Sequence, residues 1–183
     1  MHRSKLALVG GALALATMLS TGCSADSDRT AAAVAPAQAE PRADLSLAPA
    51  EGDPVVSLTG LVDSDGPLEV DLAGLDALPQ QSLTTYEPFL KADVVFSGVS
   101  FADLLDAAGA TGDSVLVHAL DDYERTIDID VLREPGVLLA TREAGEEIPV
   151  PNGGPVRLVF PEGSTAGADP DLWVWSVDRL SVS

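Results

Sequence analysis

The sequence predicts an α+β fold, a compact domain of mixed sheets in which strands predominate over a few short helices. Short β-rich runs recur from residue 55 to the C-terminus. Two clear helical segments, near residues 71–78 and 100–109, are short and lie among those runs. Because strands outnumber helices and do not alternate regularly with them, a doubly wound parallel sheet is disfavoured.

The first elements predict a hairpin followed by a short helix. The run "VVSLTGLV" (55–62) is β-rich, the turn "DSDG" follows it, and "LEV" forms a second short strand. Asp71 is placed to cap a helix that carries Leu72, Leu75 and Leu78 and ends before Pro79.

Two further β-rich stretches, "SLTTYEPF" and "DVVFSGV", precede the clearest helix, "SFADLLDAAG". Ser100 and Asp103 form a capping box at its start, and Gly109 ends it. One apolar stripe on this helix is predicted to face the core: Phe101, Leu104, Leu105 and Ala108.

The remaining runs predict mostly strands. "SVLVHAL" and "YERTIDI" flank Asp121 and Asp122 as a hairpin, and "GVLLAT" and "PVRLVFP" are short buried strands. The alternating segment "LWVWSVDRLSV" is predicted to close the chain as a strand.

The N-terminus has the pattern of a secretory signal and contains the chain's single cysteine. His2, Arg3 and Lys5 form a basic head, and an apolar run too short to span a bilayer comfortably follows them. Small residues directly precede Cys23, an arrangement that resembles a bacterial lipoprotein processing site. We expect residues 1–22 to be a signal peptide and Cys23 to be lipidated. The alternatives are an uncleaved anchor and an ordinary secretory signal with a free thiol.

Composition then changes twice along the chain. Residues 23–53 are rich in Ala, Pro and acids, with almost no large apolar side chains, so we expect a flexible spacer. We expect residues 54–183 to form one globular domain. The lipid on Cys23 would tether it in the bacterial cell envelope, on the outer face of the cytoplasmic membrane. A formal net charge of −19 argues against nucleic acid as a partner.

One dense polar group stands out in the domain. His118 is its only histidine, which rules out a histidine cluster for zinc and a Cys-His dyad. If the domain has a ligand site, we expect it around His118, Asp122, Tyr123 and Arg125. The alternative, which the alternating strand pattern favours, is a half-buried strand histidine beside a hairpin turn.

The order of these segments carries a resemblance, and its most specific pieces are "FSGVSFADLL" and "GGPVRLVFP". Together with "VSLTGLV", "VDLAGLDALP", "ALDDYERTIDIDVL" and "LWVWSVDRLSV", they make residues 55–183 similar to the oxidoreductase molybdopterin-binding domain of the sulfite oxidase family. The resemblance implies a compact α+β domain of mixed sheets that, in active members, holds a molybdenum cofactor.

The chain departs from the pattern of active members where the cofactor is held. The resemblance implies a molybdenum-ligating cysteine within the segment "LTTYEPFLKADVVFSGV", and this segment has none. The hydroxyls of Thr85 and Ser97 are poor replacements for a soft thiolate. Arg157, in the matched "GGPVRLVFP", either lines the cleft or pairs with an acid inside the sheet, and the second reading is favoured.

Two other departures concern the C-terminal match and export. No basic residue stands just before Trp173, where active members usually have one. The signal also lacks the arginine pair that folded, cofactor-loaded cargo normally carries.

Two functions remain open. The first is a membrane-tethered extracytoplasmic lipoprotein whose domain is a divergent, non-catalytic module for a small ligand or an envelope protein. The second is a molybdopterin-dependent oxidoreductase with atypical metal ligation. No metal ligands are predicted. The candidate cleft residues are Thr85, Ser97, His118, Asp122, Tyr123, Arg125 and Arg157.

Overall fold

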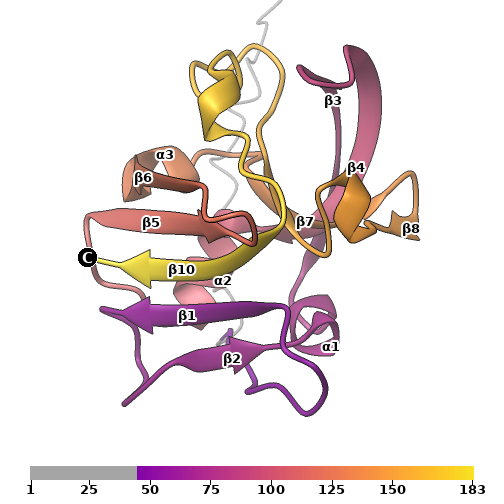
Figure 1. The fold of residues 1–183 in the computed structure, drawn as a ribbon. Helices are drawn as coiled ribbons and strands as arrows, with labels where there is room; N and C mark the ends of the chain where they lie inside the picture. The colour runs from indigo at the N-terminus through magenta and orange to yellow at the C-terminus, as the bar shows by residue number, and fades with distance from the viewer. Residues whose placement is uncertain (1–44) are drawn as a thin grey trace, which may run out of the picture. The chain divides into compact units, whose positions relative to one another are not determined.

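Two five-stranded sheets make up the fold of residues 45–183, the part of the chain that the computed structural model describes (Figure 1). The first sheet has the order β2 (Leu68–Val70), β1 (Val56–Gly60), β10 (Val177–Val182), β5 (Ser114–Ala119) and β6 (Glu124–Asp128). The second has the order β3 (Gln80–Glu87), β4 (Ala92–Ser100), β7 (Leu138–Glu143) and β8 (Glu146–Glu147), and β9 (Arg157–Val159) also pairs with β7. The pairing of β1 with β10 is parallel, and every other described pair is antiparallel. The predicted α+β class with mixed sheets is confirmed.

Both predicted hairpins of the first sheet are present. Val56 pairs with Val70 across β1 and β2, and Val115 pairs with Ile127 across β5 and β6. In each pair both side chains are buried, so the alternation of apolar and polar residues sets the register of these strands.

The helices begin at the caps that the sequence indicates. Asp71 accepts a hydrogen bond from the Gly74 N–H at 2.8 Å at the start of α1 (Leu72–Asp76), and Ser100 accepts one from the Asp103 N–H at 3.0 Å at the start of α2 (Phe101–Ala107). A third helix, α3 (Ile129–Leu132), follows β6 directly. All four stripe residues of the α2 segment are buried in the core.

Gly109, just past α2, shows why that helix ends where it does. Its φ of 61° lies in the left-handed region that favours glycine. A Cβ at this position would also lie 2.7 Å from the Cβ of Asp63. The helix therefore stops at a residue whose conformation and close neighbour both disfavour a side chain.

Part of the expected spacer, residues 23–53, contacts the domain at Leu47 and at Ala50–Gly52. Leu47 is buried in the core, and its N–H donates to the Ala107 carbonyl at 3.2 Å. The N–H groups of Glu51 and Gly52 donate to the Asp71 carboxylate, which holds this arm to the start of α1. The N–H donors of Gly74 and Gly52 also lower the pKa of Asp71. Residues 1–44, including the signal and Cys23, lie outside the described part of the chain.

The closing strand is shorter than expected. Of "LWVWSVDRLSV", only Val177–Val182 forms a strand, and a 3-10 turn at Pro170–Leu172 precedes it. Asp169 caps this turn by accepting from the Asp171 N–H, and Ser176 has a φ of 49°. The segment between the turn and β10 therefore does not join the sheet, and it carries both tryptophans of the chain.

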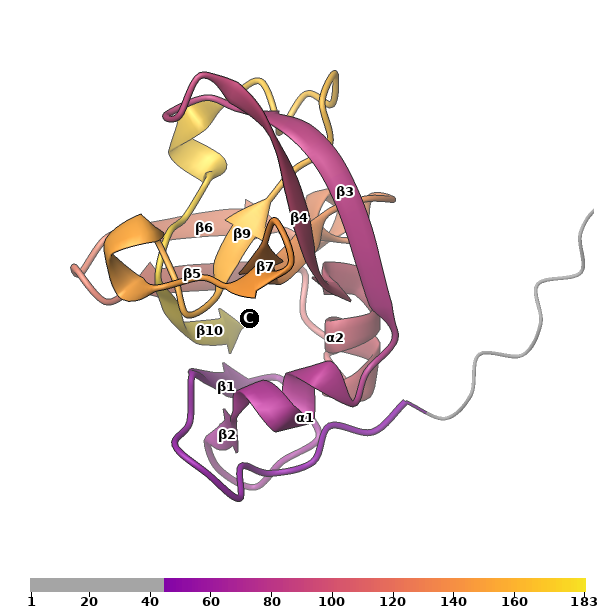
Figure 2. The same ribbon diagram turned by 90° about the vertical axis from the view of Figure 1, so that its right-hand side faces the viewer.

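The long β3–β4 hairpin extends beyond the rest of its sheet (Figure 2). At its base Gly98 lies against β7, where a Cβ would come within 2.3 Å of the Leu139 carbonyl oxygen. The register with β7 shifts between Ser97 and Gly98. The hairpin tip places Phe89 and Leu90 near the tryptophan-bearing segment, since Phe89 contacts Trp175. Within residues 45–183, no helix has the length and apolar character needed to cross a bilayer.

Candidate functional site

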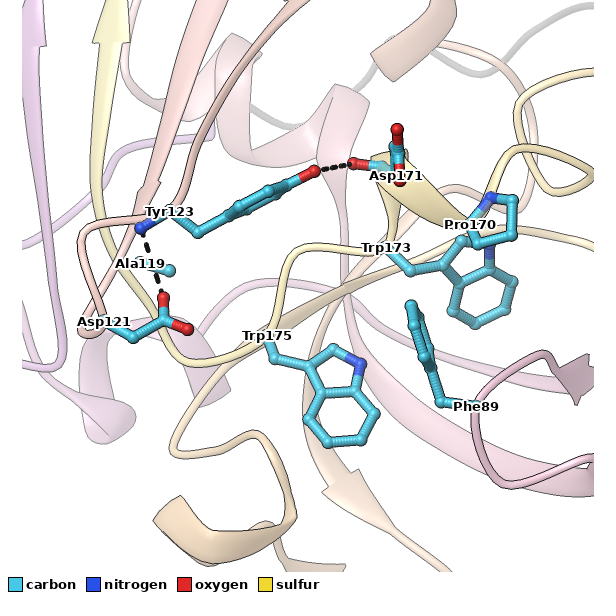
Figure 3. Close-up of a pocket in the computed structure, with 8 residues that line it drawn as sticks. All are labelled: Phe89, Ala119, Asp121, Tyr123, Pro170, Asp171, Trp173 and Trp175. Atoms are coloured by element: carbon cyan, nitrogen blue, oxygen red, sulfur yellow. Dashed lines mark hydrogen bonds between the residues drawn. The ribbon is translucent and has the colours of Figure 1, made fainter.

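A cavity of about 340 Å³ lies between the β5–β6 turn, the tip of the β3–β4 hairpin and the segment before β10 (Figure 3). It is lined by Phe89, Ala119, Asp121, Tyr123, Pro170, Asp171, Trp173 and Trp175. Four of these are aromatic, in a chain that has only eight aromatic residues. This concentration makes the cavity the candidate ligand site, since ligand pockets are mainly apolar with a few polar groups.

Each of the two tryptophans is held by its own contacts. The Trp173 indole N–H donates to the Gly167 carbonyl at 3.1 Å, and its ring meets Phe160 edge-on at 6.0 Å between centroids. Trp175 meets Phe89 edge-on at 5.4 Å. Its ring lies so close to Gly153 that a Cβ there would come within 2.8 Å of it. A glycine with a φ of 88° at residue 153 therefore makes room for this indole.

Hydrogen bonds tie the polar rim of the cavity together. The Asp121 carboxylate accepts from the Tyr123 N–H at 3.2 Å, and the Tyr123 hydroxyl donates to the Asp171 carbonyl at 2.9 Å (Figure 3). Arg125 pairs with the Asp171 carboxylate at 2.8 Å, and its guanidinium carbon lies 5.3 Å from the centre of the Tyr123 ring. Tyr123 and Asp171 both raise the pKa of Arg125. The β5–β6 turn and the 3-10 turn are thus joined across the cavity.

Arg157 lies behind the Trp175 ring and is itself buried. Its guanidinium forms an ion pair with Glu87 at 2.7 Å and lies between the rings of Trp175, at 4.4 Å, and Phe96, at 5.1 Å. The second carboxylate oxygen of Glu87 accepts from the Leu90 N–H. Burial lowers the pKa of Arg157, and the Glu87 carboxylate acts in the opposite direction. Arg157 is thus a strand residue paired with an acid, which is the arrangement that the favoured sequence reading describes.

The other predicted cleft residues lie away from the cavity lining, except Tyr123. Thr85 is buried in β3, where its hydroxyl donates to the Phe160 carbonyl at 2.9 Å. Ser97 is half-buried in β4, opposite Ser82 of β3. Neither lines the cavity, because both belong to the packed part of the second sheet.

The side chain of His118 is paired with Asp178 and does not face the cavity. Its side chain in β5 is only 12% exposed, and Nδ1 lies 2.5 Å from the Asp178 carboxylate of β10. Nε2 lies 3.7 Å from the carboxylate of Asp122 and 3.9 Å from that of Glu124. The plain alternative, a half-buried strand histidine beside a hairpin turn, describes this position. Of the four residues predicted to surround a ligand site, only Tyr123 lines the cavity, and Arg125 lies just outside the lining. His118 and Asp122 are not part of the lining.

Sequence reasoning missed most of the lining. Phe89, Trp173, Trp175 and Asp171 come from segments far from the β5–β6 turn in sequence. One signal was available, since the "DLWVW" segment holds both tryptophans next to an acid in a chain poor in aromatics. Reading this segment as a plain strand assigned those rings to the core.

The residues around the cavity do not fit a molybdenum cofactor. Residues 45–183 contain no cysteine, and within them no three His, Asp or Glu side chains cluster closely enough to hold a metal ion. A pterin phosphate needs cationic or N–H donors, yet the charged side chains lining the cavity are the carboxylates of Asp121 and Asp171. Arg157, in the family-like segment, is fully buried and engaged by Glu87. The lining therefore offers no thiolate and no basic side chain for such a cofactor, and its one unpartnered buried N–H donor is the indole of Trp175.

Comparison with known proteins gave two matches. Residues 55–168 match the family model of the oxidoreductase molybdopterin-binding domain. Among solved structures, the sulfane dehydrogenase SoxCD from Paracoccus pantotrophus is similar, with a TM-score of 0.57 and 21% sequence identity. The match covers 69% of this chain but only 37% of the SoxCD chain, and it supports the fold alone. None of the curated proteins compared gave a match.

Proposed function

The chain belongs to the oxidoreductase molybdopterin-binding domain family, and we propose that its domain is a divergent, non-catalytic module that binds a small ligand or an envelope protein. Membership confirms the resemblance that the order of the segments indicated. A fold does not by itself specify an activity, so the function has to be argued from the site.

The observation that carries the proposal is the composition of the cavity. Its walls are aromatic, and its charged lining groups are two carboxylates. A site for an anionic, thiolate-ligated cofactor requires the opposite charge and a cysteine. An aromatic cavity with a polar rim is instead suited to holding a small molecule by contact and charge.

The proposal includes a location. The basic head, the short apolar run and the small residues before Cys23 support a lipoprotein tethered to the outer face of the cytoplasmic membrane. Its partners would then be the membrane, through the lipid, and a ligand or protein of the cell envelope.

The second candidate function is a molybdopterin-dependent oxidoreductase with atypical metal ligation. The family match over residues 55–168 favours it, because the family is named for the binding of molybdopterin. In that case the metal would need a ligand other than a cysteine of the described domain.

Metal and pterin analysis separates the two candidates. The protein is purified from its own host grown with molybdate, and molybdenum is measured by elemental analysis and pterin by the fluorescence of its oxidised form. We expect far less than one equivalent of each, because the domain offers no thiolate and its cavity offers no basic side chain. About one equivalent of both would replace the proposal with the oxidoreductase.

A further inference from the structure

We propose that the cavity lined by Phe89, Tyr123, Trp173 and Trp175 binds a small organic cation, of the alkylammonium or quaternary ammonium class. This inference rests on the proposed function, because it names the ligand class of that same cavity. Two observations support it: the aromatic walls of the cavity and the negative charge around them.

The aromatic walls supply the first part of the argument. Rings from three separate segments converge on the cavity, and indole, phenol and phenyl faces attract cations through their quadrupoles. Recognition of quaternary ammonium groups by such aromatic cages is a general mode of binding. The Trp173 and Phe89 contacts described above hold these rings in place before any ligand arrives.

Two of these rings already interact with cations of the protein itself. The Arg125 guanidinium lies over the Tyr123 ring, and the Arg157 guanidinium lies over Trp175 at 4.4 Å. Neither arginine is among the residues that line the cavity. Each guanidinium is paired with a carboxylate, Asp171 or Glu87, so its charge is largely compensated. We infer that these rings accept a further cation from the cavity, because the arginine next to each ring is already paired with a carboxylate.

Charge supplies the second part. Asp121 and Asp171 line the cavity, and only Asp171 has an arginine partner, which leaves the Asp121 charge uncompensated by any described ion pair. The chain as a whole has a formal net charge of −19, which raises the local concentration of cations and repels anions. A neutral aromatic ligand would use the walls but gain nothing from this field.

The test measures binding of choline to the full-length protein and compares it with dimethylbutanol, the neutral carbon isostere of choline. Both tryptophans of the chain line the cavity, so intrinsic fluorescence reports occupancy without a label. We expect choline to bind about tenfold more tightly than the isostere, with the difference shrinking at high salt. Equal affinities, or no binding of choline, would overturn the inference.

Matched variants assign the binding to this cavity. Phe89→Leu removes an exposed wall ring, and Tyr86→Leu removes an exposed ring of the same hairpin that does not line the cavity. Asp121→Asn removes the unpaired lining charge, and Asp122→Asn removes the neighbouring charge outside it. The two cavity variants should each weaken choline binding about fivefold, and the two controls should leave it unchanged.

The outcomes also separate this inference from the proposed function. If choline binds equally well to the cavity variants and the controls, the cation site is wrong. If the host protein carries stoichiometric molybdenum and pterin, the proposed function fails whatever choline does. If the cofactor is absent and choline does not bind, the cation inference alone is lost.

Discussion

At the scale of single residues, Arg157 and Glu87 form the most deeply buried of the ion pairs described in residues 45–183. Both side chains are almost completely inaccessible, and the arginine is enclosed by two aromatic rings. Taking two charges out of water is costly, and their attraction offsets that cost only while both are present. Removing one partner leaves a bare charge in the core.

Glu87→Gln should therefore destabilise the domain by about 3–5 kcal/mol, because the guanidinium of Arg157 keeps its charge and loses its counterion. The measurement is the free energy of unfolding in urea. The double variant Glu87→Gln with Arg157→Met should recover much of the loss, since it leaves no buried charge.

The matched control is the partly exposed pair of Arg133 and Asp106, whose side chains are each 31% exposed. Arg133→Met should cost less than about 1 kcal/mol, because solvent screens this pair. A similar loss at both sites would mean that burial does not distinguish the Glu87 pair.

At the scale of elements, the arm of residues 45–53 belongs to the domain. Leu47 is only 6% exposed and packs in the core, and Asp71 binds two N–H groups of the arm as well as the start of α1. One carboxylate thus joins a helix cap to a segment some twenty residues earlier in the chain.

Leu47→Ala should lower the free energy of unfolding by about 2–3 kcal/mol, the cost of a cavity at a buried leucine. The exposed Leu61, replaced by Ala, serves as a control and should change stability by less than about 0.5 kcal/mol. Urea unfolding measures both.

A protein that begins at Pro54 should show a lower urea midpoint than one that begins at Leu45, because it lacks the contacts of the arm. Equal midpoints would mean that the arm adds nothing to the stability of the domain.

Which elements the sequence predicts depends on whether the deciding signal is local. The α2 helix follows from its Ser100 cap, its stripe and Gly109, all within ten residues, and the two hairpins follow from turns and alternation. The arm was missed because one buried leucine in an Ala- and Pro-rich segment gives no periodic signal. The late start of the closing strand was missed because the alternation of "LWVWSV" predicts a strand, although Asp169 and Pro170 just before it carry a local turn signal.

At the scale of the whole molecule, the family and the mixed sheets were predictable, but the cavity was not. Its lining joins the β3–β4 tip, the β5–β6 turn and the segment before β10, and no sequence pattern states that these three segments meet. Only Tyr123 of the predicted cleft residues lines it. Thr85 and Ser97 lie in the segment where the resemblance implies the missing thiolate, and the sheet packs them away from the cavity.

The proposed membrane tether of the protein is tested at Cys23. Replacing Cys23 with Ser should block processing or release the protein from the membrane, because lipid attachment requires the thiol. Fractionation of host cells, followed by mass analysis of the N-terminal peptide, measures both effects. Ser20→Ala, which keeps a small residue before the cysteine, is the control and should stay membrane-bound. A Cys23→Ser protein that is processed and retained as before would refute the lipoprotein.

The position of β10 has a consequence for how the chain acquires its structure. This strand is the last element described, yet it lies between β1 and β5 in the middle of the first sheet. Until residues 177–182 have left the ribosome, β1 and β5 have no shared neighbour, and a sheet assembled from distant strands forms slowly. The first sheet therefore cannot close before residues 177–182 are available, and a chain that lacks them should leave β2–β1 and β5–β6 as two unjoined pairs.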